Sequence, residues 1–211
     1  MAAESRFAAV VLAGGRARRL GGADKPSILI GGRSLLASVA GAATAAGAAR
    51  VIVVGPPRPR LLTGLAGRVP VEFTQEAQAG GGPVPALRAG LDLVGEPWVL
   101  LLAADLPFLS EPVLRALRAA ADPAAAAGAV LVDSGGRPQW LTSFWRSADL
   151  RAALGRYDGT SLHGLFTALD PVLTALEPVP GDPPCLLDCD TPEDIVTATN
   201  WATHPPQSHP S

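Results

Sequence analysis

Short apolar runs alternate with longer alanine- and leucine-rich segments over the first two thirds of the chain. Continuous apolar runs of about six residues are typical of strands buried on both faces of a sheet. These runs span residues 7–12, 50–55, 69–73 and 98–103. Helices are predicted at residues 35–46 and 84–94, and from Ser110-Glu111-Pro112 onward. Strands that alternate with helices indicate right-handed βαβ units and a mostly parallel sheet.

The last third of the chain is less regular. Strands are predicted at residues 129–132 and 140–145, as a β-hairpin around Ser134-Gly135-Gly136. A short helix at 161–169, a strand at 172–176 and a helix at 191–199 follow. We find no internal repeat and no dividing linker. We therefore expect one domain over residues 1–202, a Rossmann-like three-layer α/β sandwich with a small β-hairpin insertion, and a disordered tail over 203–211.

Charge and composition narrow the class of protein. The 17 basic and 19 acidic side chains give a net charge of −2, which argues against binding to nucleic acid or an anionic membrane. The chain shows neither signal-peptide features nor an apolar run near the ~20 residues of a membrane helix, so we expect a cytoplasmic protein. Cys185 and Cys189 are too few for a disulfide scaffold and are interpreted as buried packing residues.

A glycine-rich, basic segment follows the first predicted strand. In open α/β sheets the ligand crevice lies at the carboxyl ends of the strands, so this segment is the first place to search for a site. Gly14 and Gly15 let the backbone approach a ligand closely. Four of the 17 basic residues lie here, at Arg16, Arg18, Arg19 and Lys25. The combination favours a triphosphate site, although a flexible basic surface loop is the alternative. The spacing fits neither GxGxxG nor a P-loop.

The same segment carries a longer motif. Residues 12–25, Leu-Ala-Gly-Gly-x-x-x-Arg-Leu-Gly-Gly-x-Asp-Lys, resemble the LAGGxxxRMGxDK signature of the MobA-like nucleotidyltransferases. Within that family the nearest branch resembles the molybdenum cofactor guanylyltransferases. The resemblance implies a fold like that of the nucleotide-diphospho-sugar transferases, and it extends over residues 7–200 through three further segments.

These further segments occur in the family's order. Gly82-Pro83 matches the start of the family's GPLAGLxxGL segment, but Pro85 and Ala86 depart from it. Asp105 matches the strand-end DxPxL/F motif, and residues 188–194 match [DN]x[DN]TPEDL. A carboxylate at a strand end suits a hard divalent cation. The alternatives are a capping or loop role for Asp105 and a purely helix-capping role for the second acidic segment.

The resemblance implies roles for individual residues. The nucleotide-binding set is Leu12, Ala13, Gly14, Gly15, Arg16, Lys25, Gly82, Pro83 and Asp105. The catalytic set is Arg19, Lys25 and Asp105. Mg²⁺ is expected on Asp105 and Asp190, with Asp188 as the alternative second ligand. Trp140 and Trp145 could stack on a pterin, but core packing is the favoured interpretation.

The expected reaction is transfer of GMP from GTP to the phosphate of molybdopterin, with release of pyrophosphate. Ala13-Gly14-Gly15 favours guanine, because the cytidylyl branch more often carries Ala-Ala-Gly. The alternatives are a CTP-dependent molybdopterin cytidylyltransferase, a guanylyltransferase for a sugar phosphate or small-acid phosphate, and a non-catalytic nucleotide-binding module. Molybdoenzymes or cofactor-biosynthesis proteins are candidate partners of a monomer or weak oligomer.

Overall fold

The main sheet contains seven strands and is described by a computed structural model that covers residues 6–15, 18–78, 80–121, 126–175 and 184–204. The strands are β1 (Phe7–Leu12), β4 (Arg50–Val54), β5 (Val71–Thr74), β6 (Trp98–Ala103), β7 (Gly128–Val132), β8 (Pro138–Arg146) and β9 (Val172–Ala175). Their order is β5-β4-β1-β6-β8-β7-β9. Because β8 runs antiparallel to both neighbours while the other pairs are parallel, the predicted mostly parallel sheet is confirmed.

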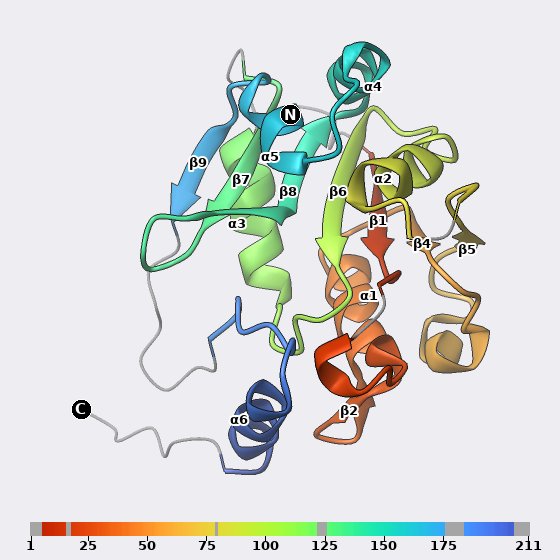
Figure 1. The fold of residues 1–211 in the computed structure, drawn as a ribbon, viewed down its shortest axis with the longest axis vertical. Helices are drawn as coiled ribbons and strands as arrows, with labels where there is room; N and C mark the ends of the chain where they lie inside the picture. The colour runs from red at the N-terminus through yellow and green to blue at the C-terminus, as the bar shows by residue number, and fades with distance from the viewer. Residues whose placement is uncertain (1–5, 16–17, 79, 122–125, 176–183, 205–211) are drawn as a thin grey trace.

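Helices cover both faces of this sheet, which confirms the three-layer architecture (Figure 1). The helices are α1 (Leu35–Ala45), α2 (Pro83–Leu91), α3 (Glu111–Ala121), α4 (Ser147–Arg156), α5 (Leu162–Thr167) and α6 (Pro192–Thr203). α1 and α3 cover one face, and α2, α4 and α5 cover the other. α6 packs against a small separate sheet of β2 (Leu29–Ile30) and β3 (Arg33–Ser34). None of the described helices is long and apolar enough to cross a membrane.

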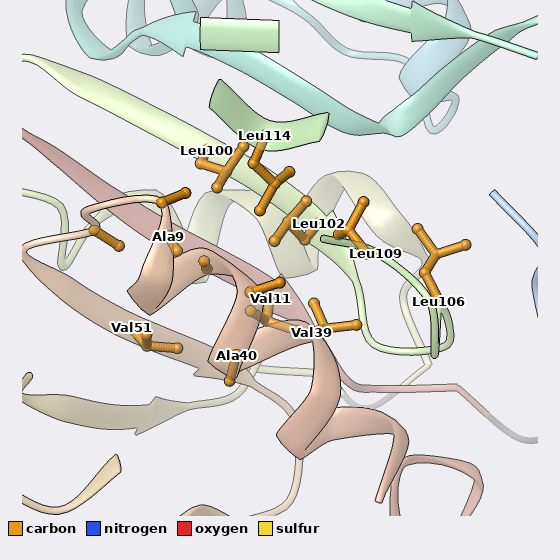
Figure 2. Close-up of a cluster of buried hydrophobic side chains, with 14 of the residues drawn as sticks. Ala9, Val11, Val39, Ala40, Val51, Leu100, Leu102, Leu106, Leu109 and Leu114 are labelled. Atoms are coloured by element: carbon orange, nitrogen blue, oxygen red, sulfur yellow. The ribbon is translucent and has the colours of Figure 1, made fainter. Parts of the chain in front are cut away.

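The two cores explain why the strand sequences are continuously apolar. Side chains alternate between the faces of a strand. In β1, Ala9 and Val11 therefore pack with α1 and α3, whereas Ala8 and Val10 pack with α2 and its neighbours. Figure 2 shows the first of these cores, where Val11 lies among side chains of α1, β6 and α3. Burial on both faces is the reason that β1 and β6 have the predicted boundaries.

A close contact holds α2 against the sheet. A Cβ on Gly90 would lie only 2.6 Å from Val10 Cγ1 and 2.8 Å from Val54 Cγ2. Only a glycine lets the helix approach β1 and β4 this closely. This packing fixes α2, whose N-cap is Gly82 and whose first residue is Pro83.

Several predicted boundaries are wrong. The helix expected at 84–94 ends at Leu91, because Leu93 and Val94 belong to a hydrogen-bonded turn. Val94 is buried and its position in the sequence fits the helical spacing, which explains the wrong boundary. α4 was not expected, because no turn residue separates it from β8. The predicted hairpin forms around Gly135-Gly136, but its strands join the main sheet rather than form an insertion. α6 runs on to Thr203, the first residue of the predicted tail, and residues 205–211 lie outside the described residues.

Candidate functional site

A pocket of about 510 Å³ opens at the carboxyl ends of β1 and β6. These two strands are paired through Leu12 and Ala103, and the Ala104 amide continues the pairing by donating to the Leu12 carbonyl at 3.2 Å. In Figure 1 the arrows of β1 and β6 point toward the end of the molecule that carries β2 and α6. The lining residues are Leu12, Ala13, Gly14, Gly15, Arg19, Lys25, Pro26, Ala104, Asp105 and Asp190.

The glycine-rich loop leaves β1 along the end of β4. The Ala13 amide donates to the Val54 carbonyl at 2.8 Å, which extends the β1–β4 pairing by one residue. Gly55 follows with a φ of +148°, and a Cβ there would lie 2.8 Å from both the carbonyl carbon and the oxygen of Ala13. The glycine after β4 therefore makes the space in which the Ala13–Gly14 peptide crosses.

The loop ends at Lys25, where a short 3₁₀ helix, η2 (Lys25–Ser27), begins. The Lys25 Nζ donates to Asp105 Oδ2 at 2.7 Å and also to Asp190 Oδ1. The three side chains are 16%, 23% and 48% exposed. Burial alone would lower the pKa of Lys25, but attraction to the two carboxylates outweighs it and raises this pKa above its usual value. Lys25 is therefore a cation at neutral pH and compensates both acidic groups.

Asp190 faces this pocket because other residues cap α6. The Thr191 Oγ1 accepts from the Asp194 amide at 3.2 Å, and Asp194 Oδ2 accepts from the Thr191 amide at 2.8 Å, which forms a capping box. The Asp190 backbone amide also donates to Asp194, but its carboxylate pairs with Lys25. The alternative of a purely capping role therefore applies to Thr191 and Asp194 and not to the Asp190 side chain.

The segment before α6 is attached to the end of β6. The Cys189 amide donates to the Asp105 carbonyl at 3.2 Å, and the Cys189 side chain is fully buried. Asp188 does not line the pocket; burial, and then the charges of Asp190 and Asp105, raise the pKa of its carboxyl. Cys185 is half-buried, and both cysteines are free thiols. The packing interpretation is thus confirmed for Cys189.

The remaining predicted residues lie elsewhere. Gly82 caps the start of α2 with a φ of +96° and Pro83 is its first residue, but neither is among the residues that line the pocket. Arg16 lies outside the described residues. The fully buried Trp145 stacks on Phe166 with ring centroids 4.6 Å apart, which confirms its packing role.

Trp140 is only partly buried. It meets the exposed His163 edge-on at 5.5 Å and packs against the core under α5. Neither ring lines the pocket.

Sequence reasoning did not select Pro26 and Ala104, which line the pocket, or Arg58, which lies beside the glycine-rich loop. The Arg58 Nε donates to both oxygens of Asp24 at 2.9 Å, and Nη2 donates to Oδ1 at 2.5 Å. Arg58 follows β4, so the rule that directs the search to carboxyl ends of strands would have selected its loop as well. The signal was a single arginine among prolines, which by composition suggested only a turn.

An α/β sandwich with glycine amides, two cations and two carboxylates in one pocket at the carboxyl edge defines a nucleotide- or phosphate-ester-binding protein. Comparison with known families makes this class specific. The MobA-like NTP transferase domain matches residues 9–179, so the chain belongs to the family of MobA-like nucleotidyltransferases.

Curated relatives match over nearly the whole chain. The molybdenum cofactor guanylyltransferase of Rhodopseudomonas palustris strain BisB5 is 35% identical, over 92% of this chain and 93% of the relative. The molybdenum cofactor guanylyltransferase of Rhodobacter capsulatus is 32% identical, over 92% and 95% respectively.

Solved structures show the same fold at lower identity. Molybdopterin-guanine dinucleotide biosynthesis protein A from Archaeoglobus fulgidus superposes with a TM-score of 0.70 at 20% identity, over 92% of this chain and 98% of that one. The 2-C-methyl-D-erythritol 4-phosphate cytidylyltransferase from Thermus thermophilus gives a TM-score of 0.64 at 20% identity, over 94% and 99%. The fold thus serves proteins named for different bases and acceptors.

Proposed function

We propose that this protein is a Mg²⁺-dependent guanylyltransferase that transfers GMP from GTP to the phosphate of molybdopterin. The observation that carries the proposal is the pocket that unites the glycine-rich loop, Arg19 and Lys25 with the carboxylates Asp105 and Asp190. Curated relatives that carry this activity in their names are 32% and 35% identical over nearly the whole chain.

The basic side of the pocket suits a triphosphate. Gly14 and Gly15 are exposed and offer backbone amides without a Cβ in front of them. Arg19 and Lys25 both line the pocket, so both can donate to phosphate oxygens. Because negative charge develops on the leaving pyrophosphate as the reaction proceeds, cations at this place stabilise the transition state.

The acidic side of the pocket fits a divalent cation. Asp105 and Asp190 contact the same Lys25 Nζ, so two carboxylates already face one cationic group in this pocket. Mg²⁺ typically takes one or two protein carboxylates and completes its shell with phosphates and water, so this donor set is sufficient. When bound there, Mg²⁺ would supply charge neutralisation at the phosphates.

Lys25 has to release the carboxylates when a metal occupies them. The negatively charged phosphate oxygens of the nucleotide would then replace the carboxylates as partners of the Lys25 ammonium and keep it charged. A single flexible side chain would then exchange internal carboxylates for phosphate oxygens.

The chemistry needs positioning more than proton transfer. An oxygen of the acceptor phosphate forms a bond to the α-phosphorus of GTP, and the bond from that phosphorus to the β-phosphate oxygen breaks to release pyrophosphate. The acceptor is a phosphate monoester, which is largely deprotonated at neutral pH, so no general base is required. The residues of the pocket therefore act by orienting two anions and neutralising their charge.

The choice of guanine rests on the names of the relatives and on Ala13-Gly14-Gly15. The choice of molybdopterin rests on the relatives alone. The proposal also includes a cytoplasmic location, a monomer or weak oligomer, and molybdoenzymes or cofactor-biosynthesis proteins as candidate partners.

The first experiment compares GTP, CTP, ATP and UTP by thermal stabilisation in the presence of Mg²⁺. A nucleotide at 100 times its Kd adds about 2.7 kcal/mol of stability, which for a chain of this size raises Tm by about 5–10 °C. Asp105→Asn should abolish a GTP-selective shift or reduce it, and the matched variant Asp92→Asn, at the far end of α2, should not. Turnover is then followed as pyrophosphate release with molybdopterin, and Asp105→Asn should lower it about 10²–10³-fold.

The outcomes separate the alternatives. A CTP-selective shift would assign the cytidylyl branch, and GTP selectivity without turnover on molybdopterin would assign another phosphorylated acceptor. No shift with any nucleotide would favour a non-catalytic module and contradict the proposal.

A further inference from the structure

Arg58 contacts both ends of the glycine-rich loop. Its Nε and Nη2 hold the carboxylate of Asp24 at 2.5–2.9 Å, and its Nη1 lies 3.4 Å from the Ala13 carbonyl and 2.9 Å from the Pro56 carbonyl. The arginine side chain is only 13% exposed. Ala13 is the first residue after β1 and Asp24 is the last before Lys25, so one guanidinium ties together the entry and the exit of the loop.

The position of Asp24 determines the position of Lys25, the next residue along the chain. Asp24 is the N-cap residue of η2, and its carboxylate also accepts from the Ser27 hydroxyl. The Ser27 amide in turn donates to the Asp24 carbonyl at 2.9 Å. Fixing the Asp24 side chain therefore fixes the first turn of η2, from which Lys25 extends toward Asp105.

Arg58 also compensates a charge next to the pocket. Asp24 is half-exposed and adjoins Lys25. The hydrogen bonds from Arg58, acting against partial burial, lower the pKa of Asp24, so its carboxyl is ionised at neutral pH. An unpaired carboxylate at this position would repel an incoming triphosphate.

We propose that Arg58 is a positioning residue of the nucleotide site: it holds Asp24 and the start of the glycine-rich loop so that Lys25 and the loop amides meet the triphosphate. The inference rests on the proposed function, because it takes a nucleoside triphosphate as the ligand. A guanidinium suits this role because it can donate to both carboxylate oxygens and to a carbonyl at once, which a lysine amine on a flexible stem does less well.

The test uses Arg58→Met, Asp24→Asn and the double variant, with Arg60→Met as the matched control. Arg60 is exposed, lies two residues further along the same segment, and has no side-chain partner recorded among the described residues. The Kd of GTP is measured with Mg²⁺ and without acceptor, so that binding is separated from turnover. Arg58→Met should weaken GTP binding about 10–100-fold, the range for loss of a charged supporting hydrogen bond, while Arg60→Met stays within about twofold of the wild type.

The double variant gives the sharper result. Because Arg58→Met leaves the negative charge of Asp24 without a compensating cation, adding Asp24→Asn should restore part of the lost GTP affinity. In steady-state turnover the loss should lie in KM for GTP and not in KM for the acceptor. Arg58→Lys, which keeps the charge, should bind GTP between wild type and Arg58→Met and serves as the readout if the methionine variant does not fold.

Three results would overturn the inference. The first is an equal Kd of GTP for Arg58→Met and Arg60→Met. The second is a double variant in which the loss of GTP affinity is the product of the two single losses, and the third is a change in KM for the acceptor alone. Amide hydrogen exchange, measured without nucleotide, tests the role of Arg58 independently of the proposed function. The Ser27 and Ile28 amides, which donate within η2, should exchange faster in Arg58→Met than in wild type or Arg60→Met. If the wild type binds no nucleotide, the proposed function fails and exchange alone decides the role of Arg58, with unchanged rates refuting it.

Discussion

Gly55 offers the most direct test of how the loop after β4 shapes the pocket. Its φ of +148° lies in a region that residues with a side chain rarely adopt, and the added Cβ of Gly55→Ala would lie 2.8 Å from Ala13 and 3.0 Å from the Gly14 nitrogen. Both neighbouring atoms belong to backbone, so neither can move aside by a simple rotamer change. The Ala13–Gly14 peptide, which lines the pocket, would have to shift.

The expected cost follows from two contributions. A residue forced into this backbone region costs about 1–3 kcal/mol, and overpacking against fixed atoms costs about 1–3 kcal/mol more. We therefore expect Gly55→Ala to lower the free energy of unfolding by about 2–6 kcal/mol. For a chain of this length that corresponds to a fall in Tm of about 4–24 °C.

The assay is thermal unfolding, followed by GTP titration well below the new Tm. Gly64→Ala is the matched control, because no heavy atom lies within 4 Å of its added Cβ and its backbone does not have a positive φ. The control should change stability by no more than about 1 kcal/mol. If Gly55→Ala had the same Tm as the control and bound GTP as tightly as the wild type does, the close contact inferred at Ala13 would be wrong.

Three further predictions concern charge and thiols. Lys25→Met should strengthen Mn²⁺ or Mg²⁺ binding without nucleotide, measured calorimetrically, because two carboxylates lose their internal cation; unchanged or weaker metal binding would contradict this. Burial, and then the charge of Asp105, raises the pKa of Cys189 to about 12, so at pH 8 a thiol reagent should label Cys185 first and Cys189 only on unfolding. Backbone hydrogen bonds in the β7–β8 turn hold the pKa of Asp133 below its usual value, so their stabilisation is present at neutral pH and is lost as pH falls through the folded pKa. Asp133→Ala should therefore lower Tm more at pH 7 than at pH 3, and an equal loss at both would refute the assignment.

Much of the fold was predictable because its strands are buried on both faces. β1 and β6 have the predicted boundaries, since an apolar run ends where a glycine-rich or acidic loop begins. α4 was not predicted, because β8 passes directly into this helix at Ser147 and no glycine or proline marks the boundary. The β2–β3 sheet was missed because two-residue strands have too few positions to show a period.

Many of the residues that line the pocket were predicted, whereas the predicted Gly82 and Pro83 do not line it and the contacts of the side chains could not be predicted. The rule that ligands bind at carboxyl ends selected Gly14, Lys25 and Asp105, and the pocket contains all of them. Asp190 was selected by resemblance, and it also lies there. The pairing of Arg58 with Asp24 joins two turns 34 residues apart, and hydrophobic patterning carries no distance information between such turns.

The salt bridges of Lys25 have a consequence for how the protein is made. Its two carboxylate partners lie 80 and 165 positions further along the chain. A ribosome releases the glycine-rich loop long before it reaches Asp190, although chains begin to fold from the amino-terminal side during synthesis. A nascent chain can therefore present its phosphate-binding loop with only one of the two acidic partners in place. Only a chain that has been synthesised past Asp190 can hold both charges, so synthesis of this late acidic residue determines when the pocket acquires its full set of groups.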